Sequence, residues 1–159
     1  MHMLPFFQWV SATPVGQAIS SSPWAFAVIE SVHLLALAVI GGAVLTLDLR
    51  LLGLGLRDQP IDRVARDAHP WLVRSLIVML VTGVLLFSSE PIKCCYSTAF
   101  WVKMSSLLLA MIFAFTVRRK VALAGEGHVR PIWLKVVAIV SLVLWFGVGA
   151  GGRWIGFSV

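Results

Sequence analysis

Charged side chains are scarce in this chain: only 13% of its 159 residues are Asp, Glu, Lys or Arg. Soluble domains average about 25%, so a water-exposed surface of the usual kind is excluded. The chain has two cysteines, Cys94 and Cys95, and as neighbours they supply no disulfide framework. The sequence also lacks a zinc-ligand spacing, a phosphate-binding loop and the arrangement of a nucleophilic triad. These absences exclude the common classes of soluble enzyme.

Apolar residues are abundant instead, at 59% of the chain with a mean hydropathy of +0.93. They form four runs of about the 20 residues that a membrane-spanning helix needs: residues 22–47, 71–87, 99–117 and 132–151. The sequence therefore predicts an all-α integral membrane four-helix bundle, a single domain over residues 1–159. The segment of about residues 4–20 is too short and too broken by Pro14 and Gly16 to span, so we expect it to lie along the interface.

The net charge of +6 is confined to certain loops. Basic residues cluster between the first two runs and between the last two, and form no single patch for nucleic acid: Arg50, Arg57, Arg63 and Arg66, then Arg118, Arg119, Lys120 and Arg130. Loops rich in Lys and Arg stay in the cytoplasm. Both termini are therefore predicted to lie on the outer side. The N-terminus has no basic stretch before its apolar residues, so no cleaved signal peptide is expected.

A few ionisable residues fall inside the predicted spans, and they share the outer half of the bundle. Glu30 and His33 are three residues apart on one helical face, about 9 and 14 Å from the outer end by helical rise. Lys103 lies about 6 Å deep on the third span, and Arg153 follows the fourth. Ionisable residues inside a membrane usually face the bundle interior and mark a site.

Two interpretations of these residues stay open. His33 is either a haem ligand or a histidine that joins helices by hydrogen bonds. In the first case Glu30 orients the imidazole or transfers a proton, and Arg153 holds a propionate. Lys103 or Met104 is then the second axial ligand, or Lys103 is a propionate partner. Lys103 also fits a lysine that snorkels to the interface. A glycine pair at the GxxxG spacing, Gly147 and Gly151, fits close helix packing or a flat macrocycle.

Copper is the alternative metal. The residues His2, Met3, Cys94 and Cys95 all fall on the predicted outer side. Imidazole, thioether and thiolate groups are ligands that suit copper(I). An incidental set of surface residues is the competing interpretation.

Several motifs resemble a bacterial family of small four-helix membrane proteins of unknown function (DUF6644-like): "ESVHLLAL", "TLDLRLLG", "TGVLLF", "AFWVKM" and "SLVLWFGVGAGGRWIGF". More remotely, the pattern is similar to CopD-type copper-resistance proteins and HemJ-type protoporphyrinogen oxidases. His33 and the Trp101-Val-Lys103 stretch resemble a histidine and a lysine that the HemJ type associates with b-type haem. The resemblance implies haem here by analogy.

The leading functional hypothesis is a b-type haem protein of the bacterial inner membrane. It would carry electrons between a membrane quinone and a partner on the periplasmic side, as a homo-oligomer or as a subunit of a larger complex. A copper uptake or delivery protein and a structural subunit without cofactor are the alternatives. If the chain takes part in an enzyme, that enzyme is an oxidoreductase.

Overall fold

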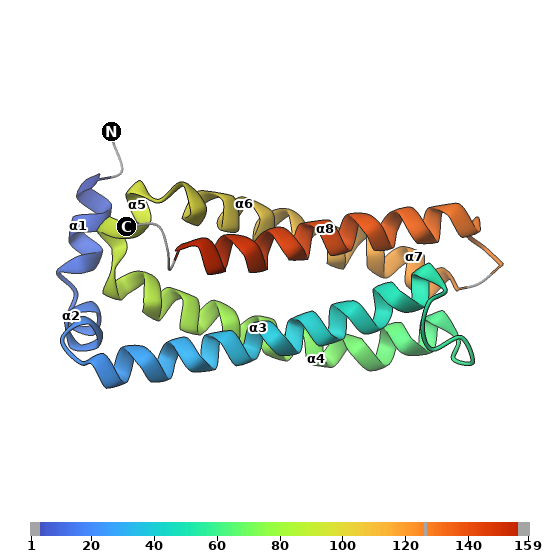
Figure 1. Ribbon diagram of the computed structural model, residues 1–159, viewed down its shortest axis with the longest axis horizontal. Helices are drawn as coiled ribbons and strands as arrows, with labels where there is room; N and C mark the ends of the chain where they lie inside the picture. The colour runs from blue at the N-terminus through green and yellow to red at the C-terminus, as the bar shows by residue number, and fades with distance from the viewer. Residues whose placement is uncertain (1–3, 126, 156–159) are drawn as a thin grey trace.

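The computed structural model describes residues 4–125 and 127–155, and its regular elements there are all helical. Three helices are long: α3 (Pro23–Leu52), α4 (Ile61–Ser89) and α8 (Pro131–Ile155). A fourth continuous pass consists of α6 (Thr98–Phe113), the π-helical segment η1 (Ala114–Arg118) and α7 (Arg119–Ala124). Short helices complete the fold (Figure 1): α1 (Leu4–Ser11), α2 (Pro14–Ser20) and α5 (Pro91–Tyr96).

The four long helical passes are each long and apolar enough to cross a membrane. Many of their large side chains are exposed, among them Leu35, Val84 and Phe146. A water-soluble monomer rarely exposes apolar surface so continuously, whereas lipid tails are a suitable environment for it. The chain is therefore a multi-pass membrane protein with four candidate spans, and the predicted all-α bundle is confirmed.

The helices extend beyond the apolar runs of the sequence. Ser22 caps α3, with its hydroxyl accepting from the Ala25 amide, and Gly53 ends the helix in the left-handed conformation at φ 75°. The second run was expected to begin near Trp71, directly after a proline. Instead α4 begins at Ile61 and continues through Pro70, because its first turns bury apolar side chains against the rest of the bundle.

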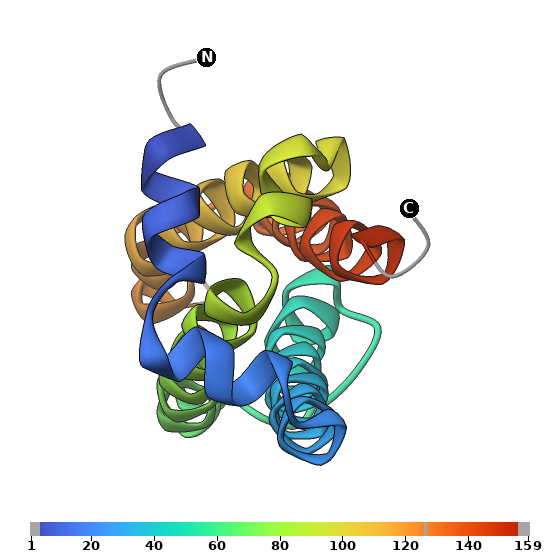
Figure 2. The ribbon, with the colours of Figure 1, turned by 90° about the vertical axis from the view of Figure 1, so that its left-hand side faces the viewer.

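The spans pack as two pairs. The closest packing joins α3 to α4 and α6 to α8, and the pairs meet mainly where α3 lies against α8. The short helices α1 and α2 lie across one end of the bundle (Figure 2), beside α5 and the C-terminal end of α8 (Figure 1). We call this the terminal end. The opposite end holds the two loops rich in arginine, and we call it the basic end.

Two apolar clusters form the core. One occupies the middle of the bundle and includes Ile40, Met79 and Val148, all almost fully buried. The other lies at the basic end and includes Val64, Ala122 and Ala138. The small residues at these positions allow the helices to approach closely, which is how membrane helices gain packing energy. Buried polar groups lie at the margins of this core, and they define the sites described next.

Candidate functional site

His33 lies at the terminal end of the bundle and links three helices. Its side chain on α3 is only 7% exposed. Its Nδ1 lies 2.9 Å from Thr82 Oγ1 on α4, and its Nε2 lies 3.2 Å from Lys103 Nζ on α6. We call these three residues the His33 cluster. It connects the α3–α4 pair to the α6–α8 pair.

The direction of the hydrogen bonds follows from what each group can donate. The Thr82 hydroxyl donates to the Val78 carbonyl oxygen at 2.7 Å, so its oxygen accepts from His33. An ammonium group has only donors, so Lys103 donates to Nε2. All contacts are satisfied when Nδ1 carries the ring hydrogen and Nε2 carries the lone pair. Thr82 therefore fixes the tautomer, and Nε2 is the nitrogen available to a ligand.

Glycines let the helix backbones approach this cluster. A Cβ at Gly83 would lie 3.3 Å from His33 Cε1, and a Cβ at Gly151 would lie 3.2 Å from the backbone nitrogen of Lys103. Gly152 faces the end of the lysine, 3.5 Å from Nζ by the same measure. The predicted GxxxG pair therefore serves close packing: Gly147 lies against Ser106 and Gly151 against Lys103, both on α6. All four passes contribute backbone or side chains to the cluster.

An aromatic pair lies about one helical turn nearer the terminal end. Phe87 of α4 and Phe100 of α6 stack with ring centroids 5.7 Å apart and an interplanar angle of 19°. Elsewhere the backbones of α4 and α6 have little contact, although the two helices occupy neighbouring corners of the bundle (Figure 2). The junction between α4 and α6 is therefore closed mainly by side chains: the aromatic stack and the Lys103–His33–Thr82 chain.

The other predicted members of the site lie at the same end but outside the cluster. Glu30 is exposed and, within the described residues, contacts neither His33 nor Lys103. The position at Nδ1 that we expected for Glu30 is taken by Thr82. Met104 is 42% exposed on α6 and, unlike its neighbour Lys103, does not reach His33. Arg153 is exposed in the last turn of α8.

The predicted copper ligands are only partly described. His2 and Met3 lie outside the described residues, as does the side chain of Cys95. Cys94 is a free, half-buried cysteine. Burial and the nearby Glu90 carboxylate raise the pKa of the Cys94 thiol, against the opposing effect of Lys103 and Lys93. A raised pKa keeps the thiol protonated at neutral pH, which weakens it as a metal ligand.

A second buried polar group, which was not among the predicted site residues, lies toward the basic end. Asp48 of α3 is fully buried and accepts from Arg118 Nε at 2.8 Å, while Arg118 Nη2 donates to the Val44 carbonyl oxygen at 3.2 Å. Ser141 of α8 lies beside the carboxylate. Within the described residues, Asp48 Oδ2 and Ser141 Oγ have no hydrogen-bond partner, and a rotation of the serine would pair them. We call Asp48, Arg118 and Ser141 the Asp48 cluster.

The sequence carried a signal for this second cluster. Asp48 stands between Leu47 and Leu49 in a continuous helical pattern, and Arg118 ends an apolar run. A predicted end of the first span near residue 47 placed Asp48 in the loop, where a carboxylate needs no explanation. Because α3 continues to Leu52, the carboxylate is inside the bundle and requires a partner.

The fold and the sites define a small four-span membrane protein whose bundle is joined at each end by a buried polar cluster. Residues 6–158 match the model of a family of unknown function, DUF6644, and the chain belongs to that family. No curated protein matches the chain. No solved structure matches it either.

Proposed function

We propose that this protein binds haem b at the terminal end of its bundle, with His33 as an axial ligand. The observation that carries the proposal is the orientation of the imidazole: Nδ1 is held by Thr82, and Nε2 points at a flexible amine across the junction of two helix pairs. Histidine ligands of iron commonly have one ring nitrogen fixed in this way by an oxygen acceptor, so that the other binds the metal.

The donor set suits haem better than a metal ion bound by protein alone. Among the described residues there is no group of three or more His, Cys, Asp or Glu side chains that could hold a metal ion. A porphyrin supplies four nitrogens itself and needs only one or two axial ligands from the protein. Bound haem would supply one-electron redox chemistry. Space for it requires Lys103 to leave Nε2 and the side chains between α4 and α6 to part.

The charged residues around His33 have distinct roles in this proposal. Lys103 would hold the haem as a second ligand or would pair with a propionate, and its unbranched stem allows either role. Arg153, exposed on the last turn of α8, pairs with a propionate. Glu30, exposed one turn from His33, would act as a proton-transfer group.

The physiological role we propose is electron transfer between a membrane quinone and a partner on the periplasmic side of the bacterial inner membrane. Two features support this orientation and role. The arginine-rich loops favour the cytoplasm, which puts the terminal end and the His33 cluster outside. The sequence around His33 and Lys103 also resembles the histidine and lysine motifs of the HemJ type, and the two side chains lie 3.2 Å apart. The protein would work as a homo-oligomer or as a subunit of an oxidoreductase complex.

Titration of the purified, detergent-solubilised protein with haemin tests the proposal. We expect a Soret band that saturates at one haem per chain, and a reduced α-band after dithionite. His33→Ala should abolish the band, and added imidazole should restore it by filling the vacated ligand position. His69→Ala, a histidine at the other end of α4, is the matched control and should bind normally. A wild-type protein that gives only the spectrum of free haemin would refute the proposal.

The role of Lys103 is tested in the haem-loaded protein. If Lys103 is the second axial ligand, Lys103→Met changes the spin state or replaces the nitrogen with a sulfur ligand, and both changes shift the Soret band. If it pairs with a propionate, the band stays in place and haem affinity falls. Lys93→Met, at the same end but outside the cluster, should leave both quantities unchanged.

A further inference from the structure

A small cavity lies at the basic end, far from the His33 cluster. Its volume is about 130 Å³, and residues of α3, α4 and the third pass line it. That volume corresponds to roughly four water molecules. Apolar side chains such as Leu47, Leu72 and Leu123 form much of the wall. The polar side chains of the lining are all basic or imidazole groups: Arg66, His69, Arg118 and Arg119.

The arginines of this lining differ in how much of their charge is available. Arg118 is 3% exposed, and its charge is balanced by Asp48 through Nε. Its Nη1 group takes part in neither of its two hydrogen bonds. The next residue, Arg119, is exposed, and no carboxylate of the described residues pairs with it. Arg118 at the end of η1 and Arg119 at the start of α7 thus supply one ion-paired and one exposed guanidinium to the same cavity.

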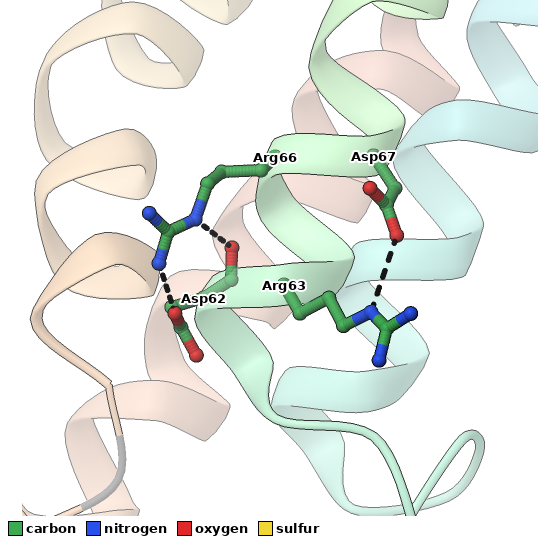
Figure 3. Close-up of polar contacts among 4 residues, drawn as sticks. All are labelled: Asp62, Arg63, Arg66 and Asp67. Carbon is green, nitrogen blue, oxygen red and sulfur yellow. Dashed lines mark hydrogen bonds and ion pairs between the residues drawn. The ribbon is translucent and has the colours of Figure 1, made fainter.

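Arg66 belongs to an exposed ion pair. It contacts Asp62 one turn earlier on α4, while Arg63 and Asp67 form a looser pair at 4.0 Å on the neighbouring face (Figure 3). Exposed pairs at this spacing are weak, so Arg66 can exchange Asp62 for another anion without disturbing the fold. Arg63 does not line this cavity, so of these two arginines only Arg66 can contact a ligand in it.

We propose that this cavity binds the phosphate group of an anionic phospholipid. Basic pockets between membrane helices bind such headgroups, and the basic end is where the helices leave the apolar layer. Arg119 and Arg66 contact the phosphate oxygens, Arg118 presents its remaining donors, and the leucines contact the start of the acyl chains. The volume is too small for a nucleotide-sized ligand, which needs at least about 300 Å³. Inorganic phosphate shares the recognition chemistry and is the second source to be tested.

Native mass spectrometry of the full chain, titrated in detergent, tests this site with three probes: phosphatidylglycerol, phosphatidylcholine and inorganic phosphate. We expect wild-type protein to retain phosphatidylglycerol at least tenfold more tightly than phosphatidylcholine. Arg119→Gln should weaken phosphatidylglycerol binding about fivefold, the contribution of one basic residue near a headgroup. Arg66→Gln should add a comparable loss. Both residues are exposed, so the variants should fold.

The matched control is Lys120→Gln. It removes one positive charge, as Arg119→Gln does, but from the next residue along the chain, whose side chain does not line the cavity. Its affinity should equal that of the wild type. Tight binding of inorganic phosphate, lost in Arg119→Gln but not in Lys120→Gln, would support the same site with a soluble ligand. Equal losses in the two variants, or equal retention of both lipids, would overturn the proposal, because the attraction would then be a property of the whole basic end.

Discussion

The two buried polar clusters differ in charge balance. The Asp48 cluster pairs a fully buried carboxylate with a buried guanidinium. The His33 cluster places an ammonium group against an imidazole and a hydroxyl, and no described carboxylate contacts Lys103. The two clusters lie 15 residues apart along α3, about 22 Å by helical rise, with the apolar core between them.

This difference separates a structural role from a binding role. A closed, opposite-charge pair holds helices in register, and its disruption leaves an unpaired charge in an apolar environment. A cation held only by neutral acceptors is matched better by an anionic group of a ligand than by its present partners. We therefore assign stability chiefly to the Asp48 cluster and binding chiefly to the His33 cluster.

The largest effect is expected from Asp48→Ala, which leaves Arg118 buried without its carboxylate. Breaking a buried pair from one side costs about 3–5 kcal/mol, so the thermal unfolding midpoint in detergent should fall steeply. The double variant Asp48→Leu/Arg118→Met should recover much of this loss, because neither charge then remains. If the double variant unfolds as early as the single one, the unpaired charge of Arg118 is not the cause of the loss.

Gly151→Ala should come next. Its Cβ would lie 3.1 Å from Lys103 Cβ and 3.2 Å from the Cα, so α6 and α8 must separate, at a cost of about 1–3 kcal/mol. The measurement is the same unfolding midpoint. Gly149→Ala is the matched control: its Cβ would meet nothing within 4 Å, and alanine favours a helix over glycine. If Gly151→Ala and Gly149→Ala change the unfolding midpoint equally, the packing of α8 against Lys103 does not contribute to stability.

Lys103→Met should change stability less than Asp48→Ala does. It removes a donor to His33 Nε2, and an unsatisfied buried acceptor costs about 1–3 kcal/mol, but it also removes the burial of an ammonium group. We expect a net loss of about 1 kcal/mol or less, measured by unfolding without haem. A loss as large as that of Asp48→Ala would mean that both clusters are structural in the same sense.

A similarly small effect on stability is expected from Thr82→Val, which keeps the shape and removes the acceptor of His33 Nδ1. The expected cost is about 1 kcal/mol, but the tautomer of His33 is no longer fixed, so haem affinity should fall more than stability. Thr46→Val is the control, since the Thr46 hydroxyl is exposed and bonds only within its own helix. Equal haem affinity in both variants would show that Thr82 does not position the ligand.

Part of the candidate site was predictable from residue type and position. His33 and Lys103 are costly inside a membrane, and their depth along two spans entering from the same side predicts that they are close. Thr82 was not predictable, because a threonine in an apolar helix usually bonds its own backbone; here it does so and also accepts from His33. Glu30 shows the opposite error: its spacing from His33 suggested a contact, but the side chain is exposed.

Hydrophobicity along the chain determined the four candidate membrane spans, because transfer of about 20 apolar residues into lipid depends on local sequence alone. Loop charge and the cost of buried ionisable groups likewise pointed to one end of the bundle. Only the tertiary structure decided which polar groups meet. Helix rotation and pairing are set by the packing of small residues such as Gly83 and Gly151 against neighbouring helices. For this reason the His33–Thr82 contact and the Asp48–Arg118 pair, 49 and 70 residues apart in sequence, became visible only in the fold.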